Sequence, residues 1–134
     1  MATLADTNVL LDVATKDPDW GEWSLRALGA AALQGPVLIN AVIYAEFSIG
    51  YARIEKVDRL LSETGVELIE TPREALFLAG KAFQRYRRQG GKRTNVLPDF
   101  FIGAHAAVAD MPLISRDRRR YRQYFPTLRL IAPE

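Results

Sequence analysis

Three carboxylate side chains stand in segments that carry no other charge, and this isolation points to a shared cation. The only charged residues are Asp6 in positions 1–11, Glu46 in 41–52 and Asp99 in 96–109. An ionised carboxylate among apolar neighbours loses hydration worth several kcal/mol unless another group replaces it. Because none of the three segments contains an arginine, one divalent ion would compensate all three acids at once.

A fourth acid, Asp117, follows an apolar run near the C-terminus. Four carboxylates from separate segments form an oxygen-only donor set, which suits Mg²⁺ or Mn²⁺, whereas zinc usually takes nitrogen or sulfur ligands. Each acid alone has a simpler explanation. Asp6 would cap a helix, Asp99 would sit favourably in a first helical turn, and Asp117 would pair with a neighbouring arginine on the surface. Glu46 would lie partly exposed at a helix edge. The metal-site hypothesis therefore rests on the four acids together.

Composition removes several other kinds of site. The 134 residues include no cysteine and one histidine, His105. Disulfides, thiolate zinc sites, iron–sulfur clusters and cysteine nucleophiles are excluded, and a Ser-His-Asp triad would depend on His105 alone. The chain has no basic leader, and no apolar run approaches the ~20 residues of a membrane span. We expect a soluble cytoplasmic protein with no membrane partner.

The elements that must position the acids follow from the hydrophobic pattern. Strands are predicted at 2–5, 37–39, 66–70, 112–115 and 128–131. Helices are predicted at 7–14, 22–33, 41–52, 54–64, from Pro72 to about Tyr86, 98–109 and 116–125. Apolar strands that alternate with helices are typical of a parallel sheet covered on both faces. We predict a single α/β domain over 1–134, a three-layer α/β/α sandwich with a mostly parallel five-stranded sheet.

The predicted topology brings the acids together. Asp6 follows the first strand and Asp117 the fourth, so both lie at the carboxyl edge where open α/β sheets place their ligands. Glu46 belongs to the helix after the second strand, and Asp99 begins the helix before the fourth. We expect the four side chains to face one pocket.

Charge is unevenly distributed along the chain. Residues 1–80 hold six basic and twelve acidic residues, a net charge of −6, whereas residues 81–134 hold twelve and four, a net charge of +8. A basic C-terminal part indicates a polyanionic partner, with nucleic acid the first candidate, while a merely dipolar, solvated surface is the alternative.

Four short motifs together resemble the PIN-domain ribonucleases. They are DTNVLLD at 6–12, AEF at 45–47, LPDFFIGAHA at 97–106 and LISRD at 113–117. The resemblance covers essentially the whole chain and is strongest to the VapC toxins of toxin–antitoxin modules. It implies that Asp6, Glu46, Asp99 and Asp117 form the family's catalytic and metal-binding quartet. It also implies that Asn8 and Ser115 support the acids through hydrogen bonds or water.

The resemblance further implies an activity and partners. The activity is RNA phosphodiester hydrolysis with one or two Mg²⁺ or Mn²⁺ ions, which leaves a 5′-phosphate and a 3′-hydroxyl. Asp6 and Asp99 would bind metal directly, Glu46 would bind metal or orient water, and Asp117 would act directly or through water. The expected partners are a VapB-like antitoxin and a second copy of the chain in a homodimer.

In this context basic and aromatic residues near the quartet become candidates for RNA contact. The candidate phosphate-binding residues are Arg87, Arg88, Lys92, Arg93, Arg116 and Arg118. Tyr121 and Tyr124 could stack on bases, although inward packing is the expectation for both. His105 is expected in the core or at an interface, and Trp20 and Trp23 are candidates for a partner surface.

Two other functions compete with the nuclease. A phosphotransferase of the haloacid dehalogenase type also has an aspartate after its first strand, but it needs a second aspartate two positions later, where this chain has Asn8. A PIN-like module that binds RNA or a protein without cleavage would be favoured by a missing acid. P-loop and dinucleotide-binding fingerprints are absent.

Overall fold

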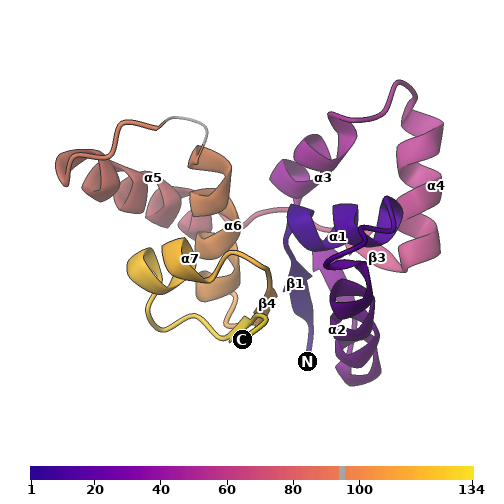
Figure 1. Cartoon of the computed structure of the whole chain (residues 1–134). Helices are drawn as coiled ribbons and strands as arrows, with labels where there is room; N and C mark the ends of the chain where they lie inside the picture. The colour runs from indigo at the N-terminus through magenta and orange to yellow at the C-terminus, as the bar shows by residue number, and fades with distance from the viewer. Residues whose placement is uncertain (94–95) are drawn as a thin grey trace.

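The computed structural model describes residues 1–93 and 96–134, in which five strands and seven helices are present (Figure 1). The strands are β1 (Thr3–Ala5), β2 (Val37–Ile39), β3 (Val66–Leu68), β4 (Leu113–Ile114) and β5 (Leu130–Ile131). The helices are α1 (Thr7–Ala14), α2 (Gly21–Gln34), α3 (Ala41–Ser48), α4 (Ile54–Thr64), α5 (Arg73–Arg88), α6 (Leu97–Val108) and α7 (Arg118–Tyr124). None of the described helices is both long and apolar enough to span a membrane.

All strand pairs are parallel, in the order β3-β2-β1-β4-β5. The chain first builds outward from β1 through β2 to β3, and then crosses to the other side of β1 to add β4 and β5. The switch point of this topology lies between β1 and β4, where Leu4 is in register with Leu113. Ligand sites of open α/β sheets occur at the carboxyl ends of the strands beside such a point. The predicted fold is confirmed.

The helices form the two outer layers around the sheet. In Figure 1, α1 to α4 lie on one side of β1, and α5, α6 and α7 lie on the other. The three central strands are fully buried, whereas the edge strands β3 and β5 are partly exposed. The apolar central strands therefore provide the core that fixes the position of the switch point.

Several predicted boundaries differ from the observed ones. The helix predicted over 41–52 ends at Ser48, whose hydroxyl donates to the Tyr44 carbonyl, and Gly50 follows in a turn. Glycine costs a helix interior up to ~1 kcal/mol relative to alanine, which favours an early end. The helix predicted from residue 116 begins at Arg118, because Asp117 holds non-helical backbone angles.

An aromatic cluster joins α5, α6 and α7. The rings of Phe83 and Tyr86 on α5 lie 5.5 Å from the ring of Phe100 on α6, which in turn lies 5.1 Å from that of Tyr124 on α7. At Gly103, α6 has no side chain, and the rings of Phe125 and Tyr121 approach its backbone closely. A glycine at this position lets α7 pack tightly against α6.

Gly103→Ala is expected to destabilise the fold. A Cβ at this position would lie 2.6 Å from the Phe125 ring, and such overpacking costs roughly 1–3 kcal/mol. Gly80→Ala is the control, because a Cβ there meets nothing within 4 Å and alanine favours a helix by ~1 kcal/mol. Urea unfolding should rank Gly80→Ala above the wild type and Gly103→Ala below it. A Gly103→Ala variant as stable as the wild type would contradict the packing described.

Candidate active site

Asp6 lies at the carboxyl end of β1 and is 3% exposed. Its Oδ1 accepts a hydrogen bond of 2.7 Å from the Thr7 backbone N–H, so the residue caps α1. Its Oδ2 accepts from Ser115 Oγ at 2.6 Å, from Tyr121 Oη at 3.0 Å and from Asn8 Nδ2 at 3.3 Å. Asp6 therefore does more than cap a helix: neutral donors from α1, from the residue after β4 and from α7 converge on its carboxylate.

Burial raises the pKa of Asp6 to about 6. The hydrogen bonds from Ser115, Tyr121 and Thr7 act in the opposite direction and lower this pKa. The charge of Glu46 raises the pKa of Asp6 further. Neutral hydrogen bonds stabilise an ionised carboxylate, but they do not cancel its charge. The negative charge of the Asp6 carboxylate therefore remains for a cation to neutralise.

Asp99 and Glu46 complete a group of electrostatically coupled acids. Burial raises the pKa of Asp99 to about 6, and the carboxylates of Asp6 and Asp117 raise it further. Burial and the Asp99 charge likewise raise the pKa of Glu46. Like charges raise one another's pKa only when they are close, so these interactions place all four predicted acids in one region.

Glu46 is held in the group through α1. Its Oε1 accepts a hydrogen bond of 2.7 Å from Thr7 Oγ1. Thr7 thus uses its backbone N–H for Asp6 and its hydroxyl for Glu46. The sequence reasoning missed Thr7, although its position directly after Asp6 was a signal.

An arginine from α7 reaches two of the four acids. Arg120 Nη1 is paired with Asp99 Oδ2, and the same nitrogen lies 3.2 Å from Asp117 Oδ2. The absence of arginine from the segments around the three isolated acids thus did not exclude an arginine partner, because α7 supplies one. Asp117 does pair with an arginine, but with the one a helical turn away and not with an adjacent one.

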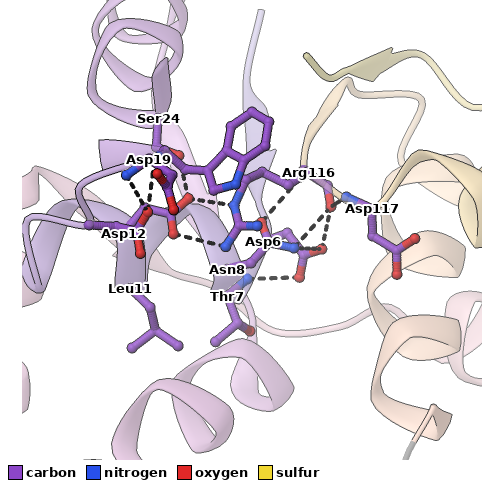
Figure 2. A network of polar contacts seen from close by, with 12 residues as sticks. Asp6, Thr7, Asn8, Leu11, Asp12, Asp19, Ser24, Arg116 and Asp117 are labelled. Atoms are coloured by element: carbon purple, nitrogen blue, oxygen red, sulfur yellow. Dashed lines mark hydrogen bonds and ion pairs between the residues drawn. The ribbon is translucent and has the colours of Figure 1, made fainter. Parts of the chain in front are cut away.

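A second buried carboxylate, Asp12, forms a network beside the acid group (Figure 2). Arg116 donates to both of its oxygens, from Nε at 2.7 Å and from Nη2 at 2.9 Å, and Ser24 Oγ donates at 2.7 Å. The Arg116 guanidinium also lies 5.4 Å from the Trp20 ring centre. In Figure 2, Asp117 points away from this ion pair. The Asp12 charge is thus neutralised within the fold, unlike that of Asp6.

Asn8 and Ser115 link the two networks. Besides their bonds to Asp6, the Asn8 Oδ1 accepts from the Arg116 backbone N–H at 3.2 Å and the Ser115 Oγ accepts from the Asp117 backbone N–H at 3.0 Å. Both residues therefore fix the backbone between β4 and α7. This is the geometry that a supporting role requires.

The other predicted residues are dispersed around this centre. Exposed positions near the end of α5 and in the loop after it hold Arg87, Arg88, Lys92 and Arg93. Arg118 is exposed and donates to the Pro133 carbonyl at 3.4 Å. Tyr121 and Tyr124 are buried, as expected from inward packing.

His105 and the two tryptophans lie outside the acid group. His105 is buried on α6, where its Nδ1 accepts from Asn40 Nδ2 at 3.1 Å, and burial lowers its pKa. Its expected place in the core is confirmed. Trp23 is half-buried against the core, and Trp20 is exposed over Arg116.

The residues of the group fit a hard divalent ion by their chemistry. All four are oxygen donors, and burial disfavours the ionised forms of Asp6, Glu46 and Asp99. Within residues 1–93 and 96–134, no three acidic or histidine side chains already lie in a ligand arrangement. Arg120 lies between two of the acids instead, so binding of an ion at Asp99 and Asp117 requires this side chain to move.

Comparison with known proteins decides the family. The PIN domain family matches residues 3–126. The chain belongs to the PIN-domain family. No curated protein matches this PIN domain by sequence. The resemblance inferred from the four motifs is confirmed at the level of the family.

Solved structures with the same fold are complexes of toxin–antitoxin systems. VapBC2 from Rickettsia felis, bound to a DNA fragment from its promoter, matches with a TM-score of 0.74 and 21% identity over 100% of both chains. VapBC-1 from nontypeable Haemophilus influenzae matches with a TM-score of 0.71 and 20% identity over 98% of both. A toxin–antitoxin complex from Klebsiella pneumoniae matches with a TM-score of 0.70 and 21% identity, again over 98% of both. These likenesses establish a shared fold for this PIN domain.

The raised pKa of Asp6 predicts a pH-dependent stability. Between its ordinary value of 3.8 and about 6, the folded chain keeps a proton that the unfolded chain releases, so this group adds stability as the pH falls. Between pH 7 and pH 5, the free energy of unfolding of the wild type, relative to Asp6→Asn, should rise by about 1 kcal/mol.

Urea unfolding of both proteins at several pH values measures this difference. Protonation of the buried His105, whose pKa is lowered, opposes the trend equally in both proteins, so the difference between them reports Asp6 together with the effect of its charge on Asp99. Asp110→Asn, at a side chain that is 92% exposed, should keep the wild-type profile. Parallel profiles for the wild type and Asp6→Asn would contradict a raised pKa at Asp6.

Proposed function

We propose that this PIN domain is a Mg²⁺- or Mn²⁺-dependent endoribonuclease and the toxin of a VapBC-type toxin–antitoxin module. The observation that carries the proposal is the group of coupled carboxylates at the switch point, where Asp6 is buried without a neutralising ion pair among the described residues. Membership of the PIN family and the fold shared with VapBC complexes support it. The whole chain, residues 1–134, would act as one domain in the cytoplasm.

In this proposal the four acids have distinct tasks. Asp6 and Asp99, in which burial raises the pKa most clearly, would hold the ion directly, Asp117 would hold it directly or through water, and Glu46 would bind metal or orient water. The chemistry that such an ion would supply is polarisation of a phosphodiester and activation of water as a nucleophile. Neutral hydrogen bonds from Ser115 and Asn8 orient the Asp6 carboxylate without reducing its charge. Products with a 5′-phosphate and a 3′-hydroxyl are expected.

Basic side chains around the acid group supply the contacts that RNA needs. Arg87, Arg88, Lys92 and Arg93 are exposed, whereas the Arg116 guanidinium is held by Asp12. We therefore propose that Arg116 contacts RNA only through the part of its guanidinium that Asp12 does not occupy. Arg118 is proposed to contact RNA through its exposed guanidinium. Binding that depends on such contacts weakens as salt concentration rises.

Replacement of an acid separates the proposed nuclease from its alternatives. Asp6→Asn and Asp99→Asn are each expected to lower Mn²⁺-dependent cleavage of RNA at least about a hundredfold, because a metal ligand contributes several kcal/mol to the transition state. Cleavage of total cellular RNA by purified protein, followed by mapping of the cut ends, measures the rate and the sites.

Asp110→Asn is the matched control, since its side chain is 92% exposed and lies away from the acid group. Equal cleavage by wild type, Asp6→Asn and Asp99→Asn would remove the metal-site mechanism. RNA binding without cleavage by the wild type would favour a non-cleaving PIN-like module. Release of phosphate from a small phosphomonoester, with intact RNA, would favour the haloacid dehalogenase-like alternative.

We also propose a VapB-like antitoxin and a homodimer as partners. Apolar side chains are exposed near the α3–α4 junction, with Ile49 84% and Ile54 64% exposed, and Phe77 on α5 is 68% exposed. Exposed apolar side chains of this size favour protein contacts.

Sedimentation equilibrium should find twice the chain mass of 15.0 kDa. Phe77→Ser or Ile49→Ser should shift the monomer–dimer equilibrium toward the monomer or prevent antitoxin binding. A monomer that gains no partner would contradict this part of the proposal.

A further inference from the structure

Arg120 occupies the place that a cation would take between two of the acids. Its Nη1 contacts Asp99 Oδ2 and lies 3.2 Å from Asp117 Oδ2. We propose that Arg120 is an internal counter-ion which a divalent metal displaces, and that the released guanidinium then binds a phosphate of the RNA. This inference rests on the proposed nuclease function and assigns Arg120 a positioning and substrate-binding role.

The first step of the inference is competition for the same oxygens. A divalent ion binds carboxylate oxygens at about 2.0–2.6 Å, and a guanidinium in contact with those oxygens would repel it at close range. The two cations therefore compete for Oδ2 of Asp99 and Asp117. In the metal-free chain, the positive charge of Arg120 reduces the repulsion between the carboxylates. A bound metal ion would reduce the same repulsion.

The second step is the freedom of the Arg120 side chain to move. The buried side chains of Tyr121, Tyr124 and Phe125 anchor α7 and its end against α6. The Arg120 side chain is 24% exposed, so it is not enclosed by the core. The guanidinium can therefore leave the acids while the backbone of α7 stays in place.

The third step is the destination. A cavity of about 270 Å³ has Arg120 and one of the acids, Asp117, in its wall. Its other lining side chains are Arg93 and Arg119, with Tyr86, Gln123 and Tyr124. Arginine binds phosphate in a bidentate, planar geometry, so three arginines around one cavity suit the phosphate of a polynucleotide. Because Arg120 already lines this cavity, its guanidinium would stay beside the phosphate site after it leaves the carboxylates.

These steps order the binding events. Without metal, the acids hold Arg120 and repel the RNA backbone. With metal, the acids are neutralised and the guanidinium joins the cavity beside the scissile position. Metal and RNA would therefore bind with positive coupling, because each favours the released side chain.

Titration with Mn²⁺ in the absence of RNA tests the displacement. Arg120→Gln is expected to bind Mn²⁺ about tenfold more tightly than the wild type in isothermal titration calorimetry, since a competing adjacent charge is removed. Arg122→Gln is the matched control, because it removes the same charge from an exposed position on the same helix. Its Mn²⁺ affinity should equal that of the wild type.

RNA binding tests the second proposed role of Arg120, which is to bind a phosphate. Here Arg120→Gln is expected to lower the affinity, whereas it raises the affinity for Mn²⁺. The probe is a fluorescein-labelled single-stranded RNA in Ca²⁺, measured by anisotropy. Arg120→Gln should weaken RNA binding at least about fivefold in spite of its tighter metal site, since it loses a charge-assisted phosphate contact. Arg122→Gln should change RNA binding less. A residue with a merely structural role would weaken both metal and RNA binding when replaced.

Each outcome decides the inference. Unchanged or weaker Mn²⁺ binding by Arg120→Gln overturns the displacement, and unchanged RNA binding overturns the phosphate role. Should circular dichroism show that Arg120→Gln does not fold, Arg120→Lys replaces it. Lysine keeps the charge but lacks the planar fork, so a smaller gain in Mn²⁺ affinity is expected, and no gain overturns the inference. The two proposals can fail separately. Tighter Mn²⁺ binding by Arg120→Gln supports the displacement even when the wild type cleaves no RNA, and that lack of cleavage overturns the ribonuclease proposal.

Discussion

Repulsion among partly buried carboxylates at the switch point of the sheet is the physical constraint on which the rest of this structure depends. The parallel sheet brings Asp6 to the switch point, and α3 and α6 bring Glu46 and Asp99 beside it. Burial disfavours each charge, and proximity disfavours the set. The fold therefore holds together an arrangement that is unfavourable in itself, and such arrangements are common where a protein binds cations.

Two buried aspartates six positions apart show that the fold pairs one carboxylate with an arginine and surrounds the other with neutral donors. Asp12 is paired with the two-pronged guanidinium of Arg116 and accepts from Ser24, so its charge is neutralised within the fold. Asp6 receives only neutral donors from Thr7, Asn8, Ser115 and Tyr121 in the part of the chain described. Its oxygens are oriented, but their charge persists, which is the condition a metal ligand requires.

The sequence predicted the fold and the convergence of the acids because both depend on local patterns. Short apolar strands alternate with helices, and an isolated carboxylate such as Glu46 stands out against its neighbours. The partners of these acids could not be predicted in the same way. Arg116 and Asp12 are 104 residues apart, and Arg120 reaches Asp99 from a different helix, α7. Helix ends such as Ser48 depend on small energies that composition alone resolves poorly.

The contact between Asn40 and His105 has a consequence for the helices that carry two of the acids. Asn40 caps α3 through the Ile43 N–H, and its amide also donates to the buried ring on α6. This bond joins the start of α3 to the last turn of α6, at the opposite end of α6 from Asp99. The helices that carry Glu46 and Asp99 are thus tied together by a contact between uncharged groups in which no carboxylate takes part. The acids can therefore gain or lose protons without breaking the bond that joins their two helices.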